Sequence, residues 1–202
     1  MMNDFVFPKG NEPEFIEIAE KLGIASLCFV YDTPKDISEF QKKTRVKLST
    51  AILCKPEDVK KYKGKFLTIV RAPDDQMQLR HIIEKIRPDI LFNLEFHRRK
   101  DFLHHRASGL NHILAVLAKE KGVAIGFNFS ALVSASPRDR ALFLGRMMQN
   151  IVFARKFKFR TVIASFAESP WQMRAGQELG SFFVGLGMAA VEVHTALEGV
   201  AR

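Results

Sequence analysis

Hydrophobic residues in this chain fall into seven short runs, and most runs are followed by residues typical of a helix start. The runs predict strands at 4–8, 25–30, 48–53, 66–70, 90–94, 123–128 and 161–165. Most of these runs are continuously apolar, which is the pattern of strands buried on both faces. The chain therefore reads as strands enclosed by helices.

Proline stands at or near the first position of most of the predicted helices, as in the segments 56–58 and 73–75, where acidic residues follow it. Glycine follows a predicted helix at Gly122, directly before a new apolar run. A helix is predicted over 109–121, opened by Ser108. The repeated order of strand, helix and short turn indicates one α/β architecture along the whole chain.

Seven strands that alternate with helices predict a parallel sheet, either open and doubly wound or closed into a barrel. A barrel is favoured, because the first turn lacks the glycine-rich phosphate-binding sequence of dinucleotide folds. The 202 residues lie at the lower limit for such a barrel and predict a single domain over 1–202.

Composition narrows the class of protein. Hydrophobic residues make up 47% of the chain, yet no apolar run approaches the roughly 18 residues of a membrane-spanning helix. The first residues do not resemble a secretory signal or a transit peptide, so a cytoplasmic protein without membrane contact is expected. Cys28 and Cys54 lie in apolar runs at a spacing that matches no zinc or redox motif, and they are predicted to be buried thiols.

The net charge of +9 is uneven along the chain. Residues 1–95 contain 16 Lys and Arg against 15 Asp and Glu, whereas residues 96–202 contain 15 against 7. A surface for a polyanion is therefore predicted in the second half. A second long helix is predicted over 138–154, with Arg146 and Arg155 facing solvent.

The segment FHRRKDFLHHRASGLNH, residues 96–112, contains four permanent cations and four histidines around a single carboxylate, Asp101. Arginine and lysine bind phosphate, and imidazole can donate hydrogen bonds or take up a proton near neutral pH. The segment is predicted to bind nucleic acid, with a solvated loop as the alternative. The later segment RKFKFR, residues 155–160, is either a base-stacking surface or a core segment leading into a strand.

Two other functions are open at this level. A barrel enzyme would place chemistry at the carboxyl ends of its strands, and a metal-dependent phosphoesterase there would use Asp32, Glu95, His97 and Glu168. The sequence contains no His-x-His pair and no phosphate-binding loop of the Walker type, which counts against that hypothesis. A third interpretation is a structural barrel whose basic patch docks an acidic protein.

Three long blocks carry a resemblance to a known family: DFLHHRASGLNHILAVLAKEKGVAIGFNFSALV at 101–133, RALFLGRMMQNIVFARKFK at 140–158 and TVIASFAESPWQMRAG at 161–176. Across its whole length the chain resembles archaeal ribonuclease P protein component 3, a family that includes the eukaryotic thirty-kilodalton subunit. The resemblance implies a TIM-like barrel related to polymerase-and-histidinol-phosphatase barrels. The first strand reads DFVFP where those relatives carry His-x-His, so their metal-dependent activity is not implied.

The resemblance implies a subunit of a ribonucleoprotein that removes the 5′ leader of precursor tRNA by hydrolysis. RNA is the implied catalyst and uses Mg²⁺, while the chain itself is expected to bind no metal or other cofactor and to have no catalytic residue. The implied partners are the catalytic RNA, precursor tRNA and a small ferredoxin-like protein subunit.

From the basic segment and the resemblance together, we expect one set of side chains to contact RNA. The best candidates are Arg98, Arg99, Lys100, His105, Arg106, Ser108, Asn111, His112 and Lys119. Weaker ones are Arg71, Asn128, Arg140, Lys158 and Arg174. Asp101 is expected to orient Arg106 or a neighbouring histidine.

Overall fold

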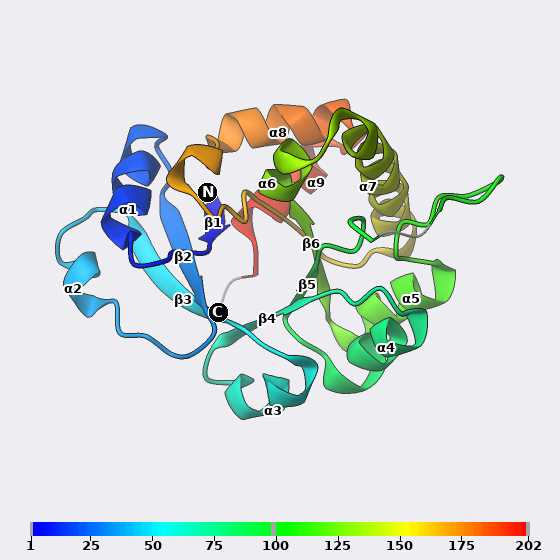
Figure 1. The fold of residues 1–202 in the computed structure, drawn as a ribbon, viewed down its shortest axis with the longest axis horizontal. Coiled ribbons are helices and arrows are strands. Elements are labelled where there is room, and N and C mark those ends of the chain that lie inside the picture. Colours follow the sequence, from blue (N-terminus) through cyan, green and yellow to red (C-terminus); the bar gives the residue numbers. More distant parts are fainter. Residues whose placement is uncertain (1, 98–99, 201–202) are drawn as a thin grey trace.

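The computed structural model describes residues 2–97 and 100–200. It contains strands and helices in the alternation that the sequence predicts (Figure 1). The strands are β1 (Asn3–Val6), β2 (Ser26–Tyr31), β3 (Lys47–Leu53), β4 (Leu67–Arg71), β5 (Ile90–Phe92), β6 (Ala124–Asn128) and β7 (Thr161–Ala164). The α-helices are α1 (Glu12–Lys21), α2 (Ser38–Gln41), α3 (Val59–Tyr62), α4 (Gln76–His81), α5 (His112–Lys121), α6 (Phe129–Ser134), α7 (Pro137–Phe157), α8 (Gly176–Gly185) and α9 (Ala190–Glu198). Short helical turns lie at η1 (Pro56–Asp58), η2 (Ile82–Ile86) and η3 (Pro170–Gln172).

The strands form one parallel sheet in which each strand pairs with the next in sequence, from β1 to β7. The sheet curls around until β1 approaches β7, where Val6 and Ala167 form a parallel bridge and the Phe7 N–H donates to the Ala167 carbonyl at 2.8 Å. Each predicted strand overlaps an observed one, with ends that differ by at most two residues. The prediction of a seven-stranded parallel barrel is confirmed.

A buried carboxylate completes the junction between β1 and β7. Asp4 is fully buried, and its two oxygens accept hydrogen bonds of 2.6 Å from the backbone N–H and the hydroxyl of Ser165. Burial raises the pKa of Asp4 to about 6, although the bonds from Ser165 act in the opposite direction. The two strands are therefore joined partly by a side chain instead of a full ladder.

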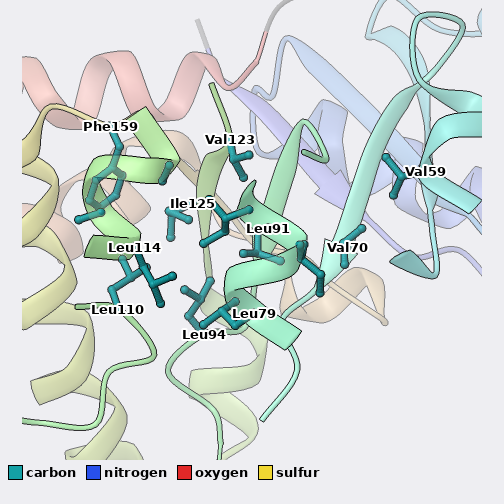
Figure 2. Close-up of a cluster of buried hydrophobic side chains, with 14 of the residues drawn as sticks. Val59, Val70, Leu79, Leu91, Leu94, Leu110, Leu114, Val123, Ile125 and Phe159 are labelled. Atoms are coloured by element: carbon teal, nitrogen blue, oxygen red, sulfur yellow. The ribbon is translucent and has the colours of Figure 1, made fainter. Parts of the chain in front are cut away.

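Apolar side chains on the two faces of the strands enter different cores, which explains the continuous apolar runs. In β2, Cys28 and Val30 point into the barrel, whereas Leu27 and Phe29 pack outside it against α1 and its surroundings. A second outer cluster lies between the strands and α5, and Figure 2 shows members such as Leu91 and Leu114 meeting there. Cys54 also belongs to this outer cluster, so both thiols are buried and free, as predicted.

Phenylalanine rings fill the interior of the barrel. Phe166 stacks on Phe92 and on Phe5, with ring centroids 4.8 and 5.6 Å apart. Phe7 stacks on both Phe92 and Phe166. Phe166 adopts a positive φ of 48°, a conformation that L residues rarely adopt, at the position where the chain turns from β7 toward the seam with β1. The barrel is thus a packed core without an open channel.

Side-chain caps define the starts of the two helices that matter for the candidate site. Ser136, directly before Pro137 in the sequence, caps α7 by accepting a hydrogen bond from the Asp139 N–H. The prediction that Ser108 opens the next helix is wrong, because Asn111 caps α5 by accepting from the Leu114 N–H at 2.9 Å. Among the described residues, no helix is both long and apolar enough to cross a bilayer.

Candidate nucleic-acid interface

The predicted basic segment forms the connection between β5 and α5, and we call residues 97–111 the basic loop. Its described part extends outward from the barrel beside α7 and α5 (Figure 1). Parallel strands place such strand-to-helix connections at the carboxyl end of the barrel, where the functional sites of this architecture lie. Arg98 and Arg99 lie outside the described residues, so their predicted contacts remain predictions.

A buried arginine of α7 anchors the base of this loop. Arg146 is 0% exposed, and its Nη1 donates to the carbonyl oxygens of Glu95 at 2.9 Å and His97 at 2.8 Å. Its Nε donates to Asp101 Oδ1 at 2.9 Å. The prediction that Arg146 faces solvent is wrong, because its guanidinium satisfies loop carbonyls that are shielded from water. The lone carboxylate among many cations, Asp101, indicated a cationic partner, but nothing in the sequence indicated that this partner is Arg146.

Asp101 links this anchor to the exposed part of the loop. Besides Arg146, it accepts a hydrogen bond from the Ala107 N–H at 2.9 Å, and its Oδ2 lies 3.5 Å from Arg106 Nη1. Partial burial acts to raise the pKa of Asp101, but the hydrogen bonds from Arg146 and Ala107 outweigh it and hold the pKa below its ordinary value. Asp101 therefore lies next to Arg106, as expected, but its shorter bond is to a residue that the sequence did not indicate.

Arg106 is held on the surface by a glycine of α7. A Cβ built at Gly145 would lie only 2.4 Å from Arg106 Cζ, so the guanidinium rests directly on the helix backbone. The backbone of Arg106 is fixed as well, since Gln149 accepts from its N–H and donates to its carbonyl, both at 2.9 Å. The Arg106 side chain remains 51% exposed. A cation is thus presented to solvent in one orientation.

Ser108, Gly109 and Asn111, which follow Arg106, have structural roles in the loop. Ser108 is fully buried and its hydroxyl accepts from Gln149 Nε2 at 2.7 Å, so this side chain is engaged within the loop and its predicted contact with RNA remains a prediction. Gly109 has a φ of +86°, and a Cβ there would lie 2.7 Å from the Leu94 carbonyl oxygen. The Asn111 side chain is exposed but already engaged in capping α5. Packing and helix capping thus account for the small and polar residues of this segment.

The outermost part of the loop exposes apolar side chains among the cations. Phe102 is 61% exposed and Leu103 is 92% exposed. The Phe102 ring stacks on the His105 imidazole with centroids 4.4 Å apart and planes 19° apart, and the Phe102 N–H donates to the His105 carbonyl at 2.9 Å. Lys100 and Arg106, which flank this ring pair in the sequence, are both exposed. A flat ring pair flanked by cations is suited to stacking on an unpaired base.

The remaining RNA-binding candidates do not form one cluster. His112 is exposed in the first turn of α5, next to the loop, but Lys119 lies at the other end of that helix. Lys158 follows α7 just before β7, so both lysines lie at the amino end of the barrel. Arg71 ends β4 at the opposite end, with its guanidinium 5.3 Å from the Phe92 ring centroid. Arg174 packs over the Phe129 ring and donates to the Trp171 and Met173 carbonyls.

Two further weak candidates also have structural roles. The Asn128 side chain is buried and caps α6 by accepting from the Ala131 N–H. Arg140 donates from its guanidinium to carbonyl oxygens at the end of α6, including that of Val133 at 2.8 Å. Neither is presented as an unengaged group toward solvent.

The four residues of the phosphoesterase hypothesis are not brought together. Asp32 and Glu168 line a hollow of about 270 Å³ at the barrel mouth, where Glu168 pairs with Lys9 at 3.3 Å. Glu95 and His97 are buried at the base of the basic loop instead. Within the described chain, no group of three or more His, Cys, Asp or Glu side chains is close enough to hold a metal ion. The geometry does not favour this hypothesis.

Glu95 has a structural role in the anchor. Its Oε1 accepts from Asn150 Nδ2 at 2.6 Å, and the same Asn150 amide donates to the Ser108 carbonyl at 2.9 Å. Complete burial raises the pKa of Glu95 to about 7, and the bond from Asn150 only partly offsets that effect. Glu95 is therefore a buried contact between the loop and α7, shielded from any substrate at the mouth.

The structure is a packed parallel α/β barrel of the TIM-barrel class, with a basic loop anchored outside a filled interior. Residues 11–202 match the family model described as RNase P subunit p30. The chain therefore belongs to the ribonuclease P subunit p30 family.

Individual proteins agree with this assignment. Ribonuclease P protein component 3 of Thermococcus gammatolerans is 29% identical over 169 residues, which cover 83% of this chain and 76% of that relative. The component 3 protein of Methanococcus maripaludis is 30% identical over 145 residues, covering 71% of this chain and 60% of the relative. A chain in a cryo-EM structure of archaeal ribonuclease P with mature tRNA has the same fold, with a TM-score of 0.78 and 22% identity over 97% of this chain and 87% of that one.

Proposed function

We propose that this protein is an RNA-binding subunit of ribonuclease P that supports removal of the 5′ leader of precursor tRNA without supplying catalytic side chains. The observation that carries the proposal is the anchored basic loop on a chain that matches the p30 family from residue 11 to residue 202. Hydrolysis is assigned to the catalytic RNA with Mg²⁺, and the chain itself is proposed to bind no metal.

Within the loop, Arg106 is the principal phosphate-binding residue in this proposal. Its guanidinium is exposed and oriented by Gly145 and Asp101, so little side-chain entropy is lost when it binds an anion. Lys100 and His112 add exposed charge or hydrogen-bond donors on either side of it. Phe102 and His105 would stack on a base that is not paired. Such binding depends strongly on salt, because each phosphate contact releases counterions.

The proposed partners are the catalytic RNA, precursor tRNA and a small ferredoxin-like protein subunit. The first two are supported by the family and by the fold shared with a chain of archaeal ribonuclease P with mature tRNA. The protein partner rests on the family resemblance. A cytoplasmic location is proposed as well, since the two free thiols, Cys28 and Cys54, fit a reducing compartment.

The test is cleavage of precursor tRNA by the cognate catalytic RNA at limiting Mg²⁺, with the small protein subunit present. Adding the wild-type protein should stimulate cleavage, and Arg106→Ala should stimulate less. Lys55→Ala is the matched control, because Lys55 is an exposed cation of another strand-to-helix connection. Equal stimulation by all three proteins would refute the assignment of the loop. Cleavage by the protein without RNA would refute the non-catalytic role.

A further inference from the structure

Exposed cations are concentrated at the amino end of the barrel, opposite the basic loop. The segments 42–47, 60–65 and 155–160 each contain four Lys or Arg residues and no carboxylate. Each leads from a helix into the next strand, namely β3, β4 and β7. In a parallel barrel all such helix-to-strand turns lie at one end. We infer that this end, which we call the basic turn face, is a second binding surface for RNA backbone, separate from the basic loop.

The side chains of this face are available to a ligand. All the Lys and Arg residues of the three segments are exposed. Arg155 is engaged by Glu192, with Nη2 and Oε2 2.6 Å apart. Among the described residues no ion pair is seen for Lys42, Lys43, Arg45, Lys60 or Lys65. Lys42 nevertheless lies near enough to Asp36 to help hold the pKa of that carboxyl below its ordinary value.

Hydrogen bonds join several neighbouring turns of this face. Strands β3 and β4 are neighbours in the sheet, so the segments 42–47 and 60–65 precede adjacent strands. The Lys63 ammonium donates to the Arg87 carbonyl in the turn before β5. Near β7, Arg160 Nη2 donates to the Gly122 carbonyl in the turn before β6, at 2.8 Å. Cations therefore follow the rim from β3 around to β7.

Helix dipoles do not account for this distribution. Lysine and arginine are favoured in the last turn of a helix, but the effect decays within that turn. The helices before the first two segments, α2 and α3, are only four residues long, and most of the cations lie beyond them. At the other end of the same strands, the connections 32–36, 56–58 and 73–75 each contain two carboxylates. The first half of the chain is balanced in charge only because the cations at the amino end of the barrel are offset by the carboxylates at its carboxyl end.

A broad, shallow, cationic surface fits a phosphodiester backbone better than a compact ligand. The hollow between the turns before β2 and β3, about 750 Å³ in volume, is lined by Lys42, Lys43 and Arg45 and is open to solvent. One carboxylate, Glu20, also lines it and accepts a hydrogen bond from the Thr44 hydroxyl. Lys119 and Lys158, predicted to bind RNA together with Arg106, belong to this end of the barrel. The choice of RNA as the polyanion rests on the proposed function. With the basic loop at the opposite end, the barrel would connect two segments of the catalytic RNA.

The test compares three variants by their affinity for the catalytic RNA as a function of KCl concentration. The first removes charge from the basic turn face, Lys42→Gln/Lys43→Gln/Lys65→Gln. The matched control, Lys9→Gln/Lys55→Gln/Arg138→Gln, removes three exposed charges elsewhere, and the third variant is Arg106→Ala in the loop. Each contact with a phosphate contributes about 0.7–0.9 to the slope of log affinity against log salt. The turn-face variant is expected to lose about 10- to 100-fold in affinity near 0.1 M salt, with a slope lower by about two.

Hydroxyl-radical footprinting of the same complexes decides whether the two surfaces meet different RNA. Loss of protection at one RNA segment in the turn-face variant, and at another in Arg106→Ala, supports the inference. An affinity and slope equal to those of the control overturn it, as does loss of protection at the same segment in both variants. An effect of the turn-face variant with none from Arg106→Ala would overturn the loop assignment alone, so the two proposals fail separately. If the turn face instead bound an acidic protein, RNA affinity would not change and the inference would be refuted.

Discussion

Replacing Arg146 by methionine is the sharpest perturbation of the loop anchor, because the two side chains are similar in length but methionine has no donor. The change removes the donors to the carbonyls of Glu95 and His97 and to Asp101. Removing one partner of a buried ion pair costs about 3–5 kcal/mol. The Asp101 side chain is 18% exposed and can recover some hydration, which favours the lower end, about 3 kcal/mol.

The assay is urea unfolding followed by circular dichroism, combined with tryptic digestion under native conditions. We expect Arg146→Met to lower the free energy of unfolding by about 3 kcal/mol and to speed cleavage within the basic loop. A cycle with Asp101→Asn should give a coupling energy above about 1 kcal/mol, because the two side chains are directly bonded. A loss below about 1 kcal/mol, or additive effects of the two changes, would refute the claim that this pair anchors the loop.

Three more outcomes are expected. Gly145→Ala should keep or raise the free energy of unfolding, since alanine favours a helix by about 1 kcal/mol over glycine. The same change should weaken RNA binding, because the new Cβ displaces the Arg106 guanidinium, and an unchanged affinity in a filter-binding assay would contradict this. Phe102→Ala should cost about 1–3 kcal/mol in RNA affinity with stability unchanged, and Phe102→Tyr should retain binding; if leucine at this position also retained it, stacking would be ruled out. Asp4 has a folded pKa raised from 3.8 to about 6, so the stability due to its protonated form is complete below about pH 4 and is lost as the pH rises through 6. Between pH 4 and pH 8 the wild type should therefore lose up to about 3 kcal/mol of unfolding free energy relative to Asp4→Asn. A pH-independent difference between the two proteins in thermal or urea unfolding would show that Asp4 is not buried as described.

The sequence by itself was sufficient to predict the parallel barrel. A strand that is continuously apolar must be covered on both faces of the sheet. The short polar turns between helix and strand allow only parallel pairing of neighbouring strands. The caps were less certain, because both Ser108 and Asn111 are suitable N-cap residues and only the close approach of Gly109 to Leu94 decides that the helix begins after the second of them. The family was also evident from the order of residues in the three long blocks.

The tertiary structure decided which of the candidate residues act together. Arg146 appeared as a solvent-facing cation in a helical pattern, and only the loop that folds over α7 buries it, because contacts between residues 45 positions apart leave no local signal. The excess of positive charge was likewise expected in the second half of the chain, whereas the structure separates the charges between the two ends of the barrel. Strands and helices that alternate in direction carry residues distant in sequence, such as Lys42 and Arg160, to the same end of the barrel, so charge that is balanced along the chain is separated in space.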